Sequence, residues 1–485
     1  MTSVLAVVIV GTLLIGCLGF LSRRRSTIDL GEWAVGGRRL GVATTWLLQA
    51  GESFTTFTFV GLVALSYSVG TASLYPLVYT PLAYLGLYLV APILWRKAKG
   101  RGYITQADFF EDVYHSRFFG WLVGVLGTVF LLPYLQLQIT GLGQIVEFAT
   151  GDKRSADWSM VGAFVLVVGF VLWSGLRGVA ATSYFKDAIM LVVLVVLVIV
   201  LPAHFYGGIP HLFEHVHAAM PKALYIHSGS YNATWFASSV LISLFGIVFL
   251  TAPHNWPSVL SARSARVLRR NYVVLPLYSL CLVLPVVLGF VAMAVLGSQS
   301  GNPDAALFTL AQRALPGWMV GVVAVGGIAA AMVPAAGILV GICPLVARNV
   351  VRVRSERGQY RTNQLTVVVL TGLALVLALF RPDSLANLLL LTFSGLSQLA
   401  PATAAALFSE RVLISKTSAI AGTVVGVAVV IVQTFSPVVS LGQLSPGLAG
   451  LAVNIVVIAG LEALRATGSK RVLPDHAVLH DAADV

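Results

Sequence analysis

The sequence predicts an all-α integral membrane protein with about thirteen transmembrane helices. The chain of 485 residues is 58% hydrophobic and only 10% charged, whereas a soluble domain carries roughly 25% charged residues. Apolar runs of about 20 residues, the length that crosses a bilayer, recur from one end of the chain to the other. The basic residues fall in short clusters between these runs, which is typical of a protein that crosses a membrane repeatedly.

The spans follow from the apolar runs and the charged breaks between them. The first run has no basic segment before it, and Arg23, Arg24 and Arg25 follow it, so we expect a retained first helix rather than a cleaved signal peptide. The connection 203–234 is polar and rich in aromatic residues and His, and we expect a cap or an interfacial helix there. The predicted spans are 3–21, 40–66, 71–95, 118–148, 158–175, 182–203, 233–253, 271–298, 317–347, 363–380, 384–408, 414–435 and 446–465.

The distribution of Lys and Arg predicts the orientation of the chain. Of the 31 basic residues, 25 lie in alternate connections and in the C-terminal tail. Because the cytoplasmic loops of membrane proteins carry the excess of Lys and Arg, we expect the N-terminus outside and the C-terminus in the cytoplasm. The same distribution accounts for the net charge of +12 without a nucleic-acid partner.

The second span contains the stretch LLQAGESFTTFTFVG, which is polar in its middle. Gly51 and the hydroxyls after it weaken helix continuity, and non-helical backbone at membrane depth is tolerated only beside protein or a cavity. A break would expose N–H groups around 54–56 at the positive end of a helix dipole, which suits a carboxylate. Glu52 lies beside this break and is a functional candidate. The alternative is a glutamate at the membrane edge of a packed bundle.

Two other spans contain polar groups. Lys186 and Asp187 lie several residues inside the sixth span. Lys186 either snorkels to the membrane surface, with Asp187 as a helix-dipole partner, or is buried and able to exchange a proton. In the fourth span, Tyr134 and Gln138 are four residues apart and share a helix face. They either line a cavity or make helix–helix hydrogen bonds.

Several functional classes are disfavoured. His211, His215 and His217 resemble a metal cluster, but two residues that are two apart on a helix do not point in one direction, so we expect no metal site. The sequence has no P-loop, zincin or nucleophile-elbow signature, which disfavours an ATP-driven pump and a membrane enzyme. The three cysteines lie in apolar runs and predict no disulfide. No cofactor and no obligate protein partner is implied.

Four segments stand out by their order and spacing. They are GEWAVGGRRLG before the second span, SGLRGVAATSYFKDAIML at the fifth-to-sixth connection, APHNWPSVLSARSARVLRRN after the seventh span, and SQLAPA in the eleventh. Together they resemble the sodium:solute symporter family, and in particular its bacterial monocarboxylate-permease branch. The resemblance runs from about residue 29 to residue 411 and implies a multi-pass protein of the bacterial cytoplasmic membrane.

The resemblance implies a LeuT-type fold with a 5+5 inverted-repeat core. The two repeats would be 40–203 and 233–408, preceded by an extra helix in 1–25. Two further spans in 414–465 and a disordered tail, 466–485, would follow the core. The substrate would bind near the midplane between the broken second and seventh spans, and alternating access would move one bundle against a scaffold.

The substrate contacts implied by the resemblance lie on the broken helices and on the fourth and eleventh spans. The solute would be a small anion. The residues expected to contact it are Gln49, Gly51, Ser53, Phe54, Thr55, Thr56, Tyr134, Gln138, Phe249, Thr251, Pro253, Ser394 and Gln398.

One departure from the family bears on the coupling ion. Sodium-coupled members carry paired hydroxyls in the ninth span, and these positions align with Val333 and Pro334 in a span that has no Ser or Thr. We therefore expect a vacant sodium site, with an ammonium group in the cation's place and protonation of Glu52 or Lys186 as the coupling event. A lone buried charge is costly, so these two residues would either pair or titrate separately. The expected coupling residues are Glu52, Ser183, Lys186 and Asp187.

The expected function is secondary active transport, with proton-driven import of small monocarboxylates of the lactate, pyruvate or acetate class. Two alternatives stay open. One is a sodium-coupled symporter of another solute, such as an amino acid, a sugar or a vitamin. The other is a sensor or channel with a transporter-like body, which the short C-terminal tail disfavours because it leaves no room for a signalling module.

Overall fold

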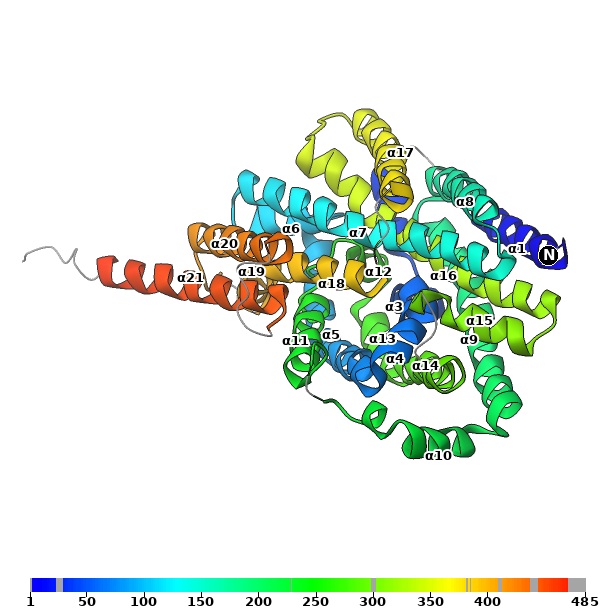
Figure 1. The fold of residues 1–485 in the computed structure, drawn as a ribbon. Coiled ribbons are helices and arrows are strands. Elements are labelled where there is room, and N and C mark those ends of the chain that lie inside the picture. The colour runs from blue at the N-terminus through cyan, green and yellow to red at the C-terminus, as the bar shows by residue number, and fades with distance from the viewer. Residues whose placement is uncertain are drawn as a thin grey trace, which may run out of the picture.

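The chain folds into a bundle of helices (Figure 1). The computed structural model describes residues 2–22, 29–227, 229–297, 302–380, 383, 385–408, 412–436 and 444–469. Within these residues there is no strand, apart from an isolated β-bridge between Leu40 and Ala262. The described part of the chain contains 11 helices that are long and apolar enough to cross a membrane. The predicted all-α membrane fold is therefore confirmed.

The predicted number of thirteen spans is not confirmed. The second and seventh spans are divided into shorter helices, and the second half of the second span runs on into the third. Most other spans form one helix each. These are α1 (Thr2–Leu21), α5 (Tyr75–Arg101), α7 (Arg117–Thr150), α8 (Lys153–Ser174), α9 (Leu176–Tyr206), α16 (Gly317–Leu345), α17 (Glu356–Phe380), α20 (Lys416–Phe435) and α21 (Pro446–Ser469).

The second span is broken in its middle. The first part, α3 (Val42–Ser53), ends where Phe54 adopts an extended backbone with φ −104° and ψ 93°. The chain resumes as a π-helical turn, η2 (Phe57–Gly61), and continues as α4 (Leu62–Val69). Thr56, within the break, packs closely on α7 at Gly141, where a Cβ atom would lie 2.0 Å from Thr56 Cγ2. Gly141 is needed because a larger residue at this position of α7 would leave no room for Thr56 of the broken second span.

The seventh span is broken as well. Its first part, α11 (Ala233–Val248), ends before Leu250, which has a left-handed φ of 50°. The chain resumes as α12 (Asn255–Leu260). The side-chain amide of Gln106, from α6 (Gln106–Val113), donates to the carbonyls of Leu250 at 3.0 Å and Thr251 at 2.7 Å. These donors stabilise the break because buried carbonyls outside a regular helix need partners.

Two further spans are interrupted only by a 3₁₀ turn. The eighth span consists of α13 (Ala265–Ser279), η5 (Leu280–Leu282) and α14 (Val283–Leu296). The eleventh consists of α18 (Leu385–Leu396), η9 (Ser397–Leu399) and α19 (Ala400–Leu407).

One end of the bundle is rich in basic residues, and we call it the basic end. There, Arg38 donates to the carbonyls of Ala98 and Tyr103, and the Arg348 Nε atom lies 2.8 Å from the Asp108 carboxylate. These contacts join the segment before α3 to the end of α5, and α6 to the end of α16. The basic end corresponds to the side that the sequence predicts to face the cytoplasm.

The opposite end carries the predicted cap. The connection after α9 contains α10 (Ile209–Ala219) and η4 (Pro221–Leu224), which run along the lower edge of the bundle in Figure 1. Thr71 Oγ1 donates to the carbonyl oxygen of Ala223 at 2.8 Å. Gly70, with φ 58°, also lies against Ala223, and a Cβ atom there would lie 2.4 Å from that oxygen. The cap is therefore fixed to the turn that follows α4.

The last two helices, α20 and α21, pack against each other at the side of the core (Figure 1). They join the core through α18 and η9, where Asn454 Nδ2 donates to the carbonyl oxygen of Gln398 at 2.7 Å. Residues 466–469, predicted to begin a disordered tail, continue α21. The rest of that predicted tail lies outside the described residues.

Candidate functional site

The break in the second span holds the ammonium group of Lys186. Lys186 lies on α9, and its Nζ atom donates to the carbonyl oxygens of Gly51 at 2.9 Å and Phe54 at 2.8 Å. The side chain is 0% exposed, so Lys186 does not snorkel to the surface. Carbonyls at the end of a helix lack intrahelical donors, and the ammonium group supplies donors to two of them.

A carboxylate lies beside this ammonium group. Asp187 Oδ1 is 2.7 Å from Lys186 Nζ, and the Asp187 side chain is 5% exposed. Ser183, one turn earlier on α9, donates to the carbonyl oxygen of Val179 at 2.8 Å. A Cβ atom at Gly51 would lie 3.2 Å from Lys186 Nζ and 3.4 Å from Ser183 Oγ. The missing side chain at Gly51 thus allows α9 to place its charged pair against the break.

A small cavity of about 20 Å³ lies against the same break. Its lining includes Gly51 and Glu52 from α3, Ser183 from α9, and Val333 and Pro334 from α16. Val333 and Pro334, the positions expected to align with sodium ligands, therefore lie beside the break in the second span. Hard cations need several oxygen ligands, and α16 contributes no side-chain oxygen here, because it has no Ser or Thr.

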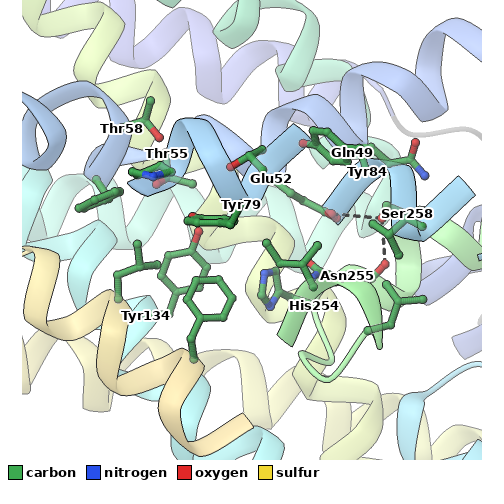
Figure 2. A pocket seen from close by; sticks show the side chains of 18 of the residues that line it. Gln49, Glu52, Thr55, Thr58, Tyr79, Tyr84, Tyr134, His254, Asn255 and Ser258 are labelled. Carbon is green, nitrogen blue, oxygen red and sulfur yellow. Dashed lines mark hydrogen bonds between the residues drawn. The ribbon is translucent and has the colours of Figure 1, made fainter. Parts of the chain in front are cut away.

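A larger cavity of about 70 Å³ lies between the two broken helices (Figure 2). A void needs roughly 10–15 Å³ by this measure to hold one water, so there is room for about five or six non-hydrogen atoms. Among the described lining residues, Glu52 is the only acidic one, and there is no Lys or Arg. The polar residues of this central cavity are Gln49, Glu52, Thr55, Thr58, Tyr79, Thr80, Tyr84, Tyr134, His254, Asn255, Ser258 and Tyr272.

Glu52 reaches from the last turn of α3 towards α12 (Figure 2). Ser258 Oγ lies 3.2 Å from Glu52 Oε2 and 2.8 Å from the carbonyl oxygen of Asn255. Ser258 Oγ is the donor in both contacts. Because a hydroxyl has one proton to donate, Glu52 and the carbonyl oxygen of Asn255 compete for it, and the contact to Asn255 is the shorter. Among the described ion pairs, Lys186 pairs with Asp187 and not with Glu52.

His254 lines both cavities at the start of α12. Its ring meets the ring of Tyr134 edge to face, with centroids 5.4 Å apart. The side chain is 7% exposed, and Nδ1 has no hydrogen-bond partner among the described residues. On α16, Gly341 allows this close approach, because a Cβ atom there would lie 2.3 Å from His254 Cα. His254 thus places an imidazole nitrogen that has no described hydrogen-bond partner between the central cavity and the smaller cavity beside Gly51.

The structure brings some of the expected substrate residues to these cavities. Gln49, Thr55 and Tyr134 line the central cavity, and Gly51 lines the smaller one. The side chain of Ser53 lies outside the described part of the structure.

Other residues that were expected to contact the substrate pack at the break in the second span and not at the central cavity. Thr56 Oγ1 donates to Gln138 Oε1 at 2.8 Å, which ties the broken segment to α7. The Phe54 ring packs against Tyr278, with centroids 4.7 Å apart. These three residues fix the shape of the second span and do not line the central cavity.

The expected contacts near the seventh-span break also lie beside the cavity and not on its wall. Phe249 stacks on Phe245, and Thr251 Oγ1 donates to the carbonyl oxygen of Gly246 at 3.0 Å. Pro253 packs on Gly127 of α7. A Cβ atom at Gly127 would lie 2.6 Å from the Pro253 ring.

Ser394 and Gln398 lie away from the central cavity in this conformation, and their assignment to the substrate site stays a prediction. Ser394 Oγ donates to the carbonyl oxygen of Leu390 at 2.7 Å. Gln398 Nε2 donates to the carbonyl oxygen of Gly447 on α21 at 3.0 Å. Gln398 thus joins the eleventh span to α21, whereas the Ser394 hydroxyl bonds within α18, and neither residue is among the described lining of the central cavity.

Several cavity residues were missed by sequence reasoning. His254, Asn255 and Ser258 belong to the APHNWPS segment, whose histidine and hydroxyl were a usable signal. Tyr79 and Tyr84 project from one helix at a spacing of five residues, which did not distinguish a cavity from ordinary packing. Thr58, Thr80 and Tyr272 carried no separate signal.

Comparison with known proteins adds to this geometry. Residues 33–426 match the family model described as Sodium:solute symporter family. The chain is 33% identical over 464 residues to the Uncharacterized symporter YhjB of Bacillus subtilis (strain 168), which covers 93% of this chain and 94% of that protein. It is 28% identical over 396 residues to the Monocarboxylate transport permease protein of Rhizobium johnstonii, covering 79% of each chain.

A solved structure is similar over nearly the whole chain. It is the substrate-bound outward-open state of a Na⁺-coupled sialic acid symporter, with a TM-score of 0.77 and 14% sequence identity. The alignment covers 95% of this chain and 97% of that chain. This likeness confirms a LeuT-type transporter fold.

Proposed function

This chain belongs to the sodium:solute symporter family and is a secondary symporter, not an enzyme, and we propose that it imports small monocarboxylates together with protons. The observation that carries this proposal is the position of the Lys186 ammonium group. It donates to carbonyls of the broken second span, beside the positions where sodium-coupled relatives are expected to hold the cation. The ammonium group thus occupies carbonyl oxygens of the break that a sodium ion there would need as ligands.

Glu52 is the proposed proton carrier. A monocarboxylate in the central cavity would lie beside Glu52 with no Lys or Arg among the described lining residues. Two carboxylates that share a site cannot both remain ionised at low cost, so the anion and a proton are expected to enter together. The protonated Glu52 would then donate a hydrogen bond to the substrate carboxylate, while the adjacent Lys186–Asp187 pair stays neutral as a unit. One proton per monocarboxylate would make transport electroneutral.

The cavity supports a substrate of this size and polarity. Room for about five or six non-hydrogen atoms suits acetate, pyruvate or lactate. Neutral donors line the cavity, including the Asn255 amide and the hydroxyls of Tyr79 and Tyr134. The similarity to the Rhizobium johnstonii monocarboxylate permease supports the same solute class.

We further propose that two inverted repeats, 40–203 and 233–408, form the transporting core. The paired breaks in the second and seventh spans support this division, because broken helices in corresponding positions mark the binding site of such transporters. The N-terminus would lie outside and the basic end in the cytoplasm, in the cytoplasmic membrane of a bacterium.

Sodium-coupled symport of another solute is the second candidate. It is favoured by the similarity of the fold to a Na⁺-coupled sialic acid symporter. This candidate requires a sodium site elsewhere, because the Lys186 ammonium group already occupies the break in the second span.

Uptake into proteoliposomes separates the two candidates. The purified protein is reconstituted, and uptake of labelled lactate is measured with an inward proton gradient in sodium-free buffer, and then with a sodium gradient at equal pH on both sides. The proposal expects accumulation under the proton gradient alone. Accumulation that requires sodium and ignores the pH gradient would contradict it.

A further inference from the structure

A separate groove of about 1100 Å³ opens at the basic end of the molecule. Its walls come from the ends of α5 and α6, from the start of α20 and from the last turns of α21. None of its described lining residues lines the central cavity. We call it the basic groove.

The charges of the basic groove do not balance. It is lined by Lys97, Arg101, Lys416 and Arg465, against two carboxylates, those of Asp112 and Glu462. The groove therefore has a net charge of +2 before His115, which also lines it, is counted.

The acidic side chains are already engaged. Asp112 accepts hydrogen bonds from Arg101 and from the Tyr103 hydroxyl, and these donors lower the pKa of Asp112 below its ordinary value, against the effect of burial. Glu462 lies 3.7 Å from Arg465 and accepts from the backbone N–H of Ser415 at 2.8 Å. Lys416, the first residue of α20, is exposed at the groove. Lys97 Nζ donates to the carbonyl oxygen of Ala406 at 2.8 Å, so Lys416 is the charge that faces the open side of the groove.

The groove lies at the level where a membrane-spanning helix meets water. Arg101 is the last residue of α5, Lys416 the first of α20, and Arg465 lies in the last turns of α21. Large apolar side chains flank these charges. Leu413, which lines the groove, is 67% exposed, and Leu464, next to Arg465, is 69% exposed. Positive charge next to exposed apolar surface is what the headgroup and acyl chains of a lipid require.

We propose that the basic groove binds the headgroup of an anionic phospholipid, whose phosphate contacts Lys416 and Arg465 on one side and Arg101 on the other. Arg and Lys form charge-assisted hydrogen bonds with phosphate oxygens. A free phosphate ion would fill only a small part of 1100 Å³, whereas a lipid with one or two phosphodiesters also covers the apolar rim. The lipid would join the α20–α21 pair to the core at the end where the groove separates them. This proposal does not depend on the substrate or the coupling ion.

Lipid binding is tested on the full-length protein in a mild neutral detergent. Its melting temperature is measured with added phosphatidylglycerol, cardiolipin, phosphatidylcholine or inorganic phosphate, and retained lipid is identified by native mass spectrometry. The variants are the double substitution Lys416→Gln, Arg465→Gln and a control, Arg270→Gln, which removes an exposed charge of α13 outside the groove.

The proposal expects the anionic lipids to raise the melting temperature of the wild type and of Arg270→Gln more than phosphatidylcholine does. The double variant should lose more than half of this difference and retain less anionic lipid. An equal shift in the double variant, or an equal shift with phosphatidylcholine, would overturn the site. A shift reproduced in full by inorganic phosphate would assign the groove to a free anion and overturn the lipid assignment.

Discussion

The Nζ atom of Lys186 lies 2.8 Å from the carbonyl oxygen of Phe54, the residue at which α3 ends. This contact joins α9 to the break of the second span through a charge-assisted hydrogen bond, which is about twice as strong as one between neutral groups. Any change in charge at the break, or in the distance between these helices, therefore acts on the same contact. This arrangement is how we expect proton binding to be linked to movement of the broken helix.

Replacing Glu52 with glutamine should separate exchange from accumulation. The amide keeps the size and a donor of the protonated carboxyl but cannot release a proton. We expect the Glu52→Gln variant to exchange internal for external lactate and to lose accumulation driven by a pH gradient. Labelled-lactate counterflow and gradient-driven uptake are measured in the same proteoliposomes.

Glu214→Gln, which changes an exposed glutamate of α10, is the matched control and should behave as the wild type. Wild-type accumulation by Glu52→Gln would remove Glu52 from the coupling mechanism.

Removing the charge of Lys186 should affect both stability and coupling. In Lys186→Met, Asp187 is left as a buried unpaired charge, and breaking a buried pair costs about 3–5 kcal/mol. The double variant Lys186→Met, Asp187→Asn removes both charges and should recover most of the loss in melting temperature. If the pair serves coupling and not only folding, the double variant will still fail to accumulate lactate. A stable double variant with normal accumulation would reduce Lys186 to a structural role.

A methyl group at position 51 should disturb the same contact. In Gly51→Ala the new Cβ atom would lie 3.2 Å from Lys186 Nζ, closer than an ordinary contact, so the ammonium group must shift. Overpacking of this kind costs about 1–3 kcal/mol, and we expect a lower melting temperature and at least a tenfold loss of uptake rate, about 1.4 kcal/mol in the activation free energy. Gly162→Ala on α8 is the control, since a Cβ atom there meets nothing within 4 Å. Equal behaviour of the two variants would contradict the role given to Gly51.

Asp304, outside the membrane-spanning helices, should make stability depend on pH. Burial raises its pKa from 3.8 to about 6, against the effect of a hydrogen bond from Gln144. A carboxyl whose pKa is higher in the folded than in the unfolded state stabilises the fold below the unfolded pKa, and this contribution is lost as the pH rises through the folded pKa. The melting temperature should therefore fall as the pH rises from about 4 to about 6. In Asp304→Asn this part of the pH dependence should disappear, and an unchanged profile would show that other groups cause it.

Much of the fold was predictable from the sequence because membrane crossing imposes length and polarity on every helix. The break in the second span was predictable from Gly51 and its neighbouring hydroxyls. The position of Lys186 several residues inside a span left burial and snorkelling equally open, and its partners were not predictable. Hydrophobic periodicity describes one helix at a time and contains no distance between helices, so a pair with Glu52 was as reasonable as the observed pair with Asp187.

The same limit applies to the expected substrate residues that lie away from the central cavity. Gln398 in the eleventh span has the polarity of a substrate ligand, but Asn454 and Gly447 on α21 hold it by hydrogen bonds. The sequence of one helix does not tell which neighbour covers a polar face. His254 was missed for a different reason, because the polar APHNWPS segment signalled a functional region but not that a helix break places this histidine between two cavities.

Proton movement during substrate entry tests the central claim most directly. Proteoliposomes in weakly buffered, sodium-free medium receive lactate, and external pH and labelled uptake are recorded together, with protein-free liposomes to correct for diffusion of the undissociated acid. We predict external alkalinisation that follows uptake at one proton per lactate and is absent in Glu52→Gln. Lactate uptake without alkalinisation, or uptake that begins only when sodium is added, would contradict the account.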